Sequence, residues 1–347
     1  MNLKSAAERF YNFAVSECKG SSDLYRELSL QISEDRDLLQ LSLSAREGQP
    51  IPNLLLGSVH YLLLKGYDHK LREYYPSITD NARQDNQLFA AFKNFCQENL
   101  EELTFLMKNK LVQTNEVRRC AYLYPVFCYI YNQTNRPLSL VEIGTSAGLQ
   151  LLWDQYSYSY DNQDSYGNED SFVHLTSTVR EGKLPHELLT STPPVNDRRG
   201  IDLHVSDLTN EEEYLWLKAL IWPEHTDRLN NLEDASKQLR DNPPNLIEGD
   251  GVKLLLKVIE GLPLHTMLCI FHTHVANQLP AEVKDNLRQQ ISDISKSREV
   301  FHIYNNMEDW KLHIDYVSNG KVERKTVGET DGHGRWFDWK LLADVLV

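Results

Sequence analysis

Residues 141–152 (VEIGTSAGLQLL) combine an apolar run, two glycines and the start of an amphipathic helical pattern. A strand that turns sharply into a helix presents unpaired backbone N–H groups, and glycines let a ligand approach the backbone there. Gly144, Ser146 and Gly148 lie in this turn, and Glu142 precedes it at the end of the strand. The sequence therefore predicts a ligand site between the strand and the helix.

The sequence of this turn can be compared with two familiar motifs. The dinucleotide fingerprint G-x-G-x-x-G is not met by Gly144, Ser146 and Leu149, which disfavours NAD or FAD. The hydrolase pattern G-x-S-x-G is met by residues 144–148, with Ser146 as the nucleophile and Asp250 and His333 as its downstream partners. A hydrolase should carry several strands and an oxyanion loop before this turn, whereas the preceding 136 residues read as helical.

The turn also resembles the first motif of class I methyltransferases, an acidic strand end followed by G-x-G-x-G. Glu142, Gly144, Ser146 and Gly148 match it, with Ser146 in place of the middle glycine. The resemblance implies S-adenosylmethionine as the cofactor and a nucleotide-binding sheet that begins at this strand.

Later residues fall in the order that this resemblance implies. Asp202 in RGIDLH would hold the ribose hydroxyls. In IEGDG, Asp250 would contact the adenine amino group, and Val252 would pack on the ring. Both aspartates are equally compatible with helix N-caps, so the two interpretations stay open.

The segment FHTH follows the fourth expected strand and would lie nearest the reacting methyl group. His272 is the candidate base if the acceptor must lose a proton, and Thr273 a candidate substrate contact. His272 and His274 share one face of a strand, but no third ligand completes a metal site, so none is predicted. Asn115 and Arg118, just before the α/β part, are further candidate substrate contacts, or they bridge the two lobes.

The secondary-structure pattern that must position these residues changes at residues 135–137. Residues 1–136 show helical spacing, whereas short apolar runs separated by helical stretches follow. We expect an α/β fold: a Rossmann-like, mostly parallel sheet of class I methyltransferase type, with an all-helical N-terminal lobe (1–136). The α/β domain (137–347) would carry a Tyr-rich insertion at about 156–196. The expected strands are 138–143, 199–204, 245–247, 267–271, 300–304, 313–317 and 335–339. The last two would form an antiparallel hairpin through Asn319-Gly320 or the longer stretch up to Gly334.

Long ordered strings across the chain also resemble a bacterial family known as DUF2332. They include QTNEVRR (113–119), EIGTSAGLQLLWDQYSY (142–158), WLKALIWPEHTDRLNNLEDA (216–235) and GHGRWFDW (332–339). The family resemblance implies a methyltransferase-like fold with a helical N-terminal lobe, and it implies no particular substrate. Trp222 and Glu224, which ordinary methyltransferases lack, would pack between helices or touch a substrate.

The charge and cysteine content of the chain limit the classes of partner and the cellular location that we expect. The formal charge of −14 falls entirely on residues 137–347, where 34 acidic side chains oppose 20 basic ones. Such a domain repels nucleic acid and anionic membranes, so neither is expected as a partner. Five cysteines without a CxxC motif indicate reduced, mostly buried thiols. No signal peptide or membrane-length apolar segment is visible, which predicts a cytoplasmic protein.

The sequence therefore predicts an S-adenosylmethionine-dependent methyltransferase acting on a small molecule. A serine hydrolase using Ser146 and a non-catalytic ligand-binding protein of the same fold remain the alternatives. The oligomeric state is left open.

Overall fold

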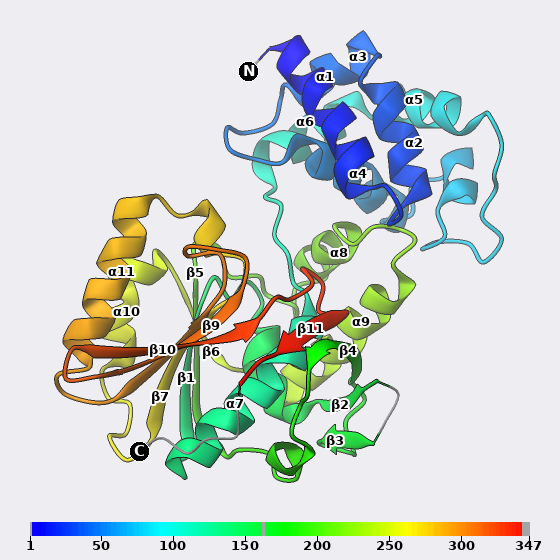
Figure 1. The fold of residues 1–347 in the computed structure, drawn as a ribbon. Coiled ribbons are helices and arrows are strands. Elements are labelled where there is room, and N and C mark those ends of the chain that lie inside the picture. Colours follow the sequence, from blue (N-terminus) through cyan, green and yellow to red (C-terminus); the bar gives the residue numbers. More distant parts are fainter. Residues whose placement is uncertain (1, 162–163, 342–347) are drawn as a thin grey trace. The chain divides into compact units, whose positions relative to one another are not determined.

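The computed structural model describes residues 2–161 and 164–341 (Figure 1). The chain divides into two compact units. The first comprises Met1–Thr114 and Leu208–Asn230, and the second Asn115–Asp207 and Asn231–Val347. Each unit contains a hydrophobic core of its own.

The first unit is helical. Its elements are α1 (Leu3–Asn12), η1 (Phe13–Glu17), α2 (Asp23–Ile32), α3 (Arg36–Ser42), α4 (Ile51–Leu64), η2 (Lys70–Tyr74), α5 (Leu88–Glu98), α6 (Leu100–Asn109) and α8 (Glu211–Ala219). Helix α4 is apolar on every side and almost wholly buried, as expected for a helix at the centre of a core. Its His60 bonds Ala219 O at 2.9 Å and Ser77 Oγ at 2.7 Å, and burial lowers the pKa of His60 to about 4.

Trp222 and Glu224 are structural in this first unit. The ring of Trp222 packs edge-on against Phe13 with centroids 5.3 Å apart. Glu224 accepts hydrogen bonds from the Ser22 hydroxyl and from Leu24 N, so it fixes the start of α2. Packing between helices thus accounts for both residues.

The second unit contains two sheets. Its elements are η3 (Val117–Arg119), α7 (Cys120–Thr134), β1 (Leu138–Ile143), η4 (Leu149–Gln155), β2 (Ser157–Tyr160), β3 (Ser165–Gly167), β4 (His174–Gly182), η5 (His186–Leu189), β5 (Val195–Asp202), α9 (Thr226–Asp241, whose first residues count with the first unit), β6 (Asn245–Glu248), α10 (Gly251–Ile259), β7 (Met267–His272), η6 (Ala276–Gln278), α11 (Ala281–Ile294), β8 (Val300–Tyr304), β9 (Leu312–Ser318), β10 (Lys321–Gly328) and β11 (Trp336–Trp339).

The main sheet has the order β10-β9-β8-β7-β1-β5-β6. Strands β8, β7, β1, β5 and β6 are parallel, while β9 runs antiparallel to both β8 and β10. The carboxyl ends of the five parallel strands therefore meet at one edge. Counted along the chain, β6-β5-β1-β7-β8 is the 3-2-1-4-5 order of doubly wound sheets, whose direction of progression reverses beside β1.

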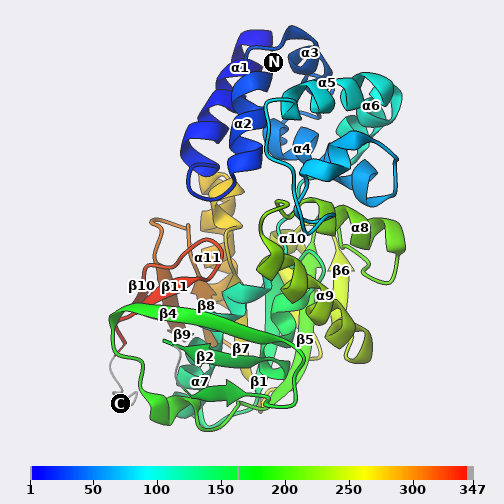
Figure 2. The ribbon, with the colours of Figure 1, turned by 90° about the vertical axis from the view of Figure 1, so that its right-hand side faces the viewer.

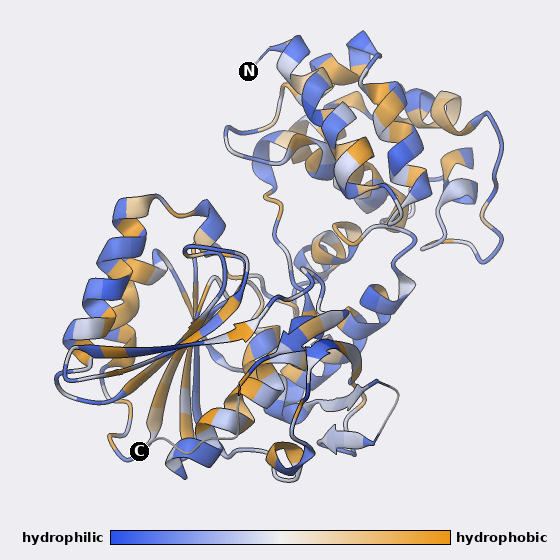
Figure 3. Cartoon of the chain, in the orientation of Figure 1, coloured by the Kyte–Doolittle hydropathy of each residue, from blue (hydrophilic) through white to orange (hydrophobic). Residues whose placement is uncertain are grey.

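Helices cover both faces of this sheet (Figure 1). Val141 of β1 and Ile270 of β7 face the apolar sides of α10 and α11, which Figure 3 shows as hydrophobic stripes. On the other face Phe127 of α7 stacks on Trp153, with centroids 4.6 Å apart, and meets Phe271 edge-on at 5.5 Å. Both faces of β1 are thus covered, and every residue of the strand is buried.

The second sheet has the order β11-β4-β2-β3 (Figure 2). It contains the Tyr-rich insertion, in which β2 and β3 pair as a hairpin. Tyr156, Tyr158 and Tyr160 are buried, and their hydroxyls donate to carbonyls, Tyr160 to Ala121 O at 2.8 Å. These tyrosines hold the insertion against α7 and η4.

The predicted fold class, a helical N-terminal region followed by a mostly parallel α/β sheet with an antiparallel C-terminal segment, is confirmed. Three details differ. The compact units divide between Thr114 and Asn115 instead of at 136, because α7 packs on the sheet, and residues 208–230 join the helical unit. The hairpin through Asn319-Gly320 pairs β9 with β10, a strand that was not predicted. The predicted last strand, β11, instead pairs in parallel with β4.

All five cysteines are buried and form no disulfide. Within residues 2–161 and 164–341, no helix has both the length and the apolar character to span a membrane.

Candidate functional site

The glycine turn after β1 is a tight β-turn. Gly148 N donates to Thr145 O at 2.8 Å, and Ser146 has φ = 51°. Ala147 is not among the residues with positive φ, and a positive φ at the second turn position alone is the type II′ pattern. That position usually takes glycine, so Ser146 adopts a strained conformation.

The backbone N–H groups of this turn are all used within the protein. Gly144 N and Thr145 N donate to Ile201 O at 2.8 and 3.2 Å, so β5 fixes the start of the turn. Ser146 N donates to Asp202 Oδ2 at 2.7 Å. Ala147 N donates to Asn115 Oδ1 at 3.2 Å. The predicted ligand-facing amides thus bind protein oxygens.

The two glycines permit close packing. A Cβ on Gly144 would lie 2.3 Å from Val275 Cγ2, and one on Gly148 would lie 2.9 Å from both Leu246 and Pro244 side-chain atoms. Helix η4 (Leu149–Gln155) follows where a helix was predicted, but it is a 3-10 helix with non-helical angles at Leu152. The backbone of the turn therefore lies against side chains of neighbouring segments.

Asp202 and Asn115 are the side chains that hold the turn. Asp202 also accepts from His204 N at 3.1 Å through Oδ1. Asn115 uses its second group as well, since Nδ2 donates to Ser146 Oγ at 2.7 Å. The two residues come from sites 87 positions apart in the sequence and meet on one turn.

Glu142 lies beneath the turn. Its side chain is 2 % exposed and accepts a hydrogen bond of 2.6 Å from Thr145 Oγ1. Burial raises the pKa of Glu142 to about 8, Asp202 raises it further, and the Thr145 hydroxyl and Arg119 oppose the shift. At neutral pH the carboxyl group is therefore mostly protonated and supports the turn as a neutral group.

Asp250 and Val252 have structural positions at the start of α10. Asp250 is the N-cap, and its Oδ1 accepts from Val252 N at 3.0 Å and Lys253 N at 3.1 Å. Val252 is 3 % exposed and belongs to the core of the sheet. The second oxygen of Asp250, Oδ2, takes no part in the cap and lies 3.3 Å from the exposed Lys253 Nζ.

His272 is enclosed at the end of β7. It has no exposed surface, and its Nε2 lies 3.1 Å from His302 Nε2. Burial lowers the pKa of His272 to about 3, so the ring is neutral. A substrate at the strand ends does not reach this ring, and the residue proposed as a base lies behind the site.

Thr273 and His274 follow directly. Thr273 Oγ1 donates to Gln150 Oε1 at 3.1 Å and lies 3.4 Å from Arg119 Nη1. His274 has φ = 55°, a second strained non-glycine residue at this edge. Its backbone N–H donates to Asn305 Oδ1 at 2.7 Å, and its Nδ1 lies 3.3 Å from Asn306 Nδ2. The amide therefore donates to Nδ1, which leaves the proton of the neutral ring on Nε2.

Buried polar atoms without a partner at this edge include His272 Nδ1, His274 Nε2 and Asn305 Nδ2. The last two are donors, and the side chain of Asn305 is fully buried. Buried polar groups are rarely left without a hydrogen bond, so each marks a place for water or a ligand oxygen. Asn306 adds a third positive φ of 62° among the non-glycine residues that follow the parallel strands.

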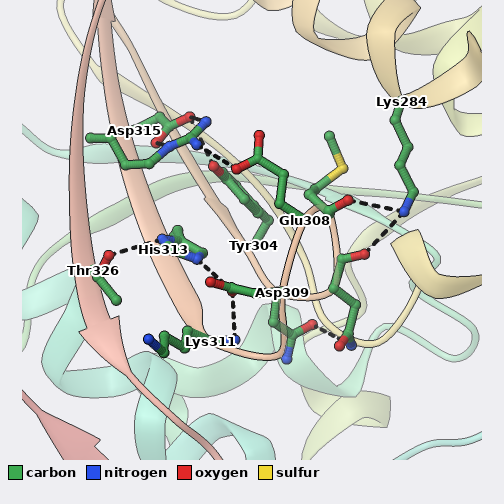
Figure 4. Close-up of polar contacts among 12 residues, drawn as sticks. Lys284, Tyr304, Glu308, Asp309, Lys311, His313, Asp315 and Thr326 are labelled. Atoms are coloured by element: carbon green, nitrogen blue, oxygen red, sulfur yellow. Dashed lines mark hydrogen bonds and ion pairs between the residues drawn. The ribbon is translucent and has the colours of Figure 1, made fainter. Parts of the chain in front are cut away.

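The loop after β8 is held firmly (Figure 4). Lys284 Nζ donates to the carbonyls of Asn306 and Met307 at 3.2 and 3.0 Å. Asp309 accepts from Lys311 N at 2.9 Å and from His313 Nε2 at 2.8 Å, and Thr326 lies on the other side of the His313 ring. This network keeps Asn305 and Asn306 beside His274.

Residues 115–119 connect the carboxyl edge of the main sheet with the loop before β11. Arg119 Nε donates to Gly332 O at 2.9 Å. The buried Glu116 carboxylate lies 3.1 Å from His333 Nδ1 and also accepts from Arg118 N at 3.2 Å. Arg118 O packs against Gly334, so the backbone of Arg118 belongs to this contact.

The structure therefore gathers some predicted residues and separates others. Asn115, Glu142, Gly144, Ser146, Gly148 and Asp202 meet at the turn, and Thr273 and Arg118 lie near Arg119. The hypothetical triad does not assemble, because Asp250 caps α10 while His333 contacts Glu116 and Ser146 Oγ contacts Asn115. Glu116, Arg119, Asn305 and Asn306 were not predicted, and no local pattern marks them. The described residues contain no cluster of three or more His, Cys, Asp or Glu able to bind a metal.

Residues 7–339 match the family described as "Uncharacterized protein conserved in bacteria (DUF2332)", and the chain is a member of it. No curated protein matches the sequence.

Proposed function

We propose that the protein is an S-adenosylmethionine-dependent methyltransferase that acts on a small molecule. One observation carries the proposal. The parallel strands follow the 3-2-1-4-5 order, and acids lie at the carboxyl ends of three of them. Glu142 is next to last in β1, Asp202 ends β5 and Asp250 follows β6. Ligands of doubly wound sheets bind outside the carboxyl ends, where the order reverses.

Side chains, not backbone amides, would hold the cofactor. Each carboxylate oxygen of Asp202 accepts one hydrogen bond and has a second lone pair for a ribose hydroxyl. The Oδ2 atom of Asp250 takes no part in the helix cap and would accept a hydrogen bond from the adenine amino group. The cofactor supplies an already activated methyl group, so the protein's main task is to position the acceptor and exclude water.

We assign the acceptor side to the ends of β7 and β8. His274 Nε2 and Asn305 Nδ2 are donors without a protein partner, which suits an acceptor bearing an oxygen. Arg119 beside Thr273 adds a buried positive charge. In this proposal His272 supports the strand end through His302 and does not take a proton from substrate.

Calorimetric titration of the full chain with S-adenosylmethionine and S-adenosylhomocysteine tests the proposal. Asp250→Asn is the informative variant, because asparagine also caps helices while the charge is lost. Asp293→Asn is the matched control, since Asp293 pairs with Lys296 three residues on, as Asp250 does with Lys253. We expect binding by the wild type and the control, and about tenfold weaker binding by Asp250→Asn. Absence of binding to folded wild-type protein at millimolar ligand would overturn the proposal.

A serine hydrolase is the second candidate, and the conformation of Ser146 favours it. Nucleophile elbows place serine on a strained strand-to-helix turn, and Ser146 at φ = 51° follows the central strand. Two contacts count against it. Ala147 N, the amide that an oxyanion hole would use, binds Asn115, and Ser146 Oγ has Asn115 as its partner instead of a histidine.

A fluorophosphonate probe distinguishes the two candidates. The methyltransferase proposal predicts no labelling of Ser146 in folded protein. Labelling of the wild type that disappears in Ser146→Ala would support the hydrolase instead.

A further inference from the structure

A pocket of about 350 Å³ lies beside α11, over β8, β9 and β10. This volume falls within the range of small-molecule sites. Its lining combines the apolar Ile291, Val317 and Val322 with the buried ring of His302 and with charged side chains. The pocket shares no residue with the glycine turn or with the cofactor residues proposed above.

The charged groups around the pocket pair with one another. Arg324 donates to Asp315 at 2.9 and 3.1 Å and to Glu308 at 2.8 Å. Arg288 donates to Asp285 at 3.1 Å and to Glu308 at 2.7 Å. Two guanidinium groups therefore meet three carboxylates, which leaves no positive charge for an anionic ligand. A cationic ligand would have to lie beside both arginines, so the lining favours a molecule without charge.

His302 brings a hydrogen-bonding atom to the pocket. The residue is 2 % exposed, and its Nε2 lies 3.1 Å from His272 Nε2. Its other ring nitrogen, Nδ1, makes no hydrogen bond within residues 2–161 and 164–341. Burial lowers the pKa of His302 well below its ordinary value, so the ring is neutral and carries one proton.

The position of that proton follows from the neighbouring His272. One of the two facing Nε2 atoms must donate and the other must accept. His272 Nδ1 is buried without a partner. A buried N–H without an acceptor is rarer than a buried lone pair without a donor, so the neutral His272 ring carries its proton on Nε2 and donates to His302. His302 therefore carries its own proton on Nδ1, as a donor that no protein group uses.

The apolar side chains define the rest of a suitable ligand. Ile291 and Val317 are buried, whereas Val322 is 56 % exposed. A hydrocarbon body placed against these three side chains would remove apolar surface from water on both partners, which favours binding.

We propose that this pocket binds a small uncharged molecule with a compact hydrocarbon body and an oxygen that accepts a hydrogen bond, as in a ketone. The oxygen would accept from His302 Nδ1, and the hydrocarbon body would lie against Ile291, Val317 and Val322. This inference does not depend on the methyltransferase proposal, because the pocket shares none of its cofactor residues.

NMR titration of the full chain with cyclohexanone tests the inference. Cyclohexanecarboxylate and cyclohexylammonium present the same ring with a negative and a positive charge. We expect saturable cyclohexanone binding with a millimolar dissociation constant, and at least tenfold weaker binding of both ions. His302→Phe keeps a ring but loses the donor and should bind cyclohexanone about fivefold more weakly. His265→Phe, at an exposed position, is the matched control and should bind it as the wild type does.

Nitrogen-15 NMR of the imidazole rings provides a second measurement on the wild type. It should find the proton of His302 on Nδ1 and that of His272 on Nε2, and cyclohexanone should shift the His302 Nδ1 signal. This measurement decides the question if the melting temperature of His302→Phe shows that the variant does not fold. Four results would each overturn the inference: no saturable cyclohexanone binding, equal binding of either ion, a His302 proton on Nε2, or unchanged binding by folded His302→Phe.

Discussion

The turn after β1 and the ends of β7 and β8 lie at the same edge of one sheet, yet they differ in how their polar atoms are satisfied. In the turn, the N–H groups of Ser146 and Ala147 bind Asp202 and Asn115. At the ends of β7 and β8, His274 Nε2 and Asn305 Nδ2 are buried without a partner. The amides of the segment with the recognisable motif are bound by side chains from other segments, whereas the segment without a motif has donors that no protein group accepts.

A recognisable motif can therefore mark a segment that supports the edge of the sheet and whose own amides are already bound. Strained residues occur in both segments, with φ of 51° at Ser146, 55° at His274 and 62° at Asn306. Strain of this kind persists only where surrounding contacts over-determine the backbone. In the turn those contacts come from two side chains, and beyond β8 from the network around Lys284 and Asp309.

The largest expected effect concerns Asp202, the main support of the turn. Asp202→Ala removes the acceptor of two backbone amides, and we expect a loss of roughly 2–4 kcal/mol in the free energy of unfolding. Asp202→Asn keeps one acceptor and should lose less than half as much. Urea unfolding measures both. Asp197→Ala, whose carboxylate lies 3.7 Å from Arg199, is the control with little loss. A loss for Asp202→Ala no larger than the loss for Asp197→Ala would show that the turn does not depend on Asp202.

The next effect concerns Glu142 and pH. Its pKa is raised from an ordinary 4.5 to about 8 in the folded state, chiefly by burial. Between these values the folded protein holds a proton that the unfolded chain has lost, so stability falls as the pH rises through this window. Glu142→Gln cannot ionise, and because one pKa unit corresponds to about 1.4 kcal/mol, we expect it to be more stable than wild type by about 2 kcal/mol or more at pH 9.

Unfolding at pH 5 and pH 9 measures this difference. At pH 5 wild type and Glu142→Gln should be nearly equal, because both carry a neutral group. Glu101→Gln, at an exposed site, should show no such pH-dependent gain. A gain for Glu142→Gln that is the same at both pH values would contradict the buried, protonated carboxyl.

The smallest effect concerns Ser146. Glycine relieves the positive φ but loses the hydrogen bond to Asn115, so Ser146→Gly should change stability by less than about 1 kcal/mol. Ser146→Ala keeps the strain and loses the same bond, and should be less stable than Ser146→Gly by about 1 kcal/mol. Thermal unfolding of both variants checks the order. The reverse order would mean that the turn is not strained at this residue.

The sequence predicts most of the sheet, because its parallel strands are short apolar runs between turns. Strand β10 was missed since its sequence, KVERKTVG, is mostly charged and exposed, as edge strands often are. The helix after the turn was predicted, but its 3-10 geometry was not, because an apolar pattern does not distinguish a 3-10 helix from an α-helix.

The candidate site was only partly predictable. Glu142, Gly144 and Asp202 follow from strand ends, which local patterns reveal. The pairing of Glu116 with His333 joins residues 217 positions apart, and that of Arg119 with Gly332 joins residues 213 apart. Asn305 has no motif, and only the folded chain brings it to His274. Long-range contacts of this kind carry no spacing signal in a single sequence.

Hydrogen exchange with and without S-adenosylhomocysteine tests the central claim most directly, because it reports where a ligand binds on the sheet. The account predicts slower exchange of backbone amides in residues 202–206, 250–254 and 273–276, at the carboxyl ends of β5, β6 and β7, with the helical residues 23–64 unchanged. Unchanged exchange at these strand ends, or protection confined to other segments, would contradict it.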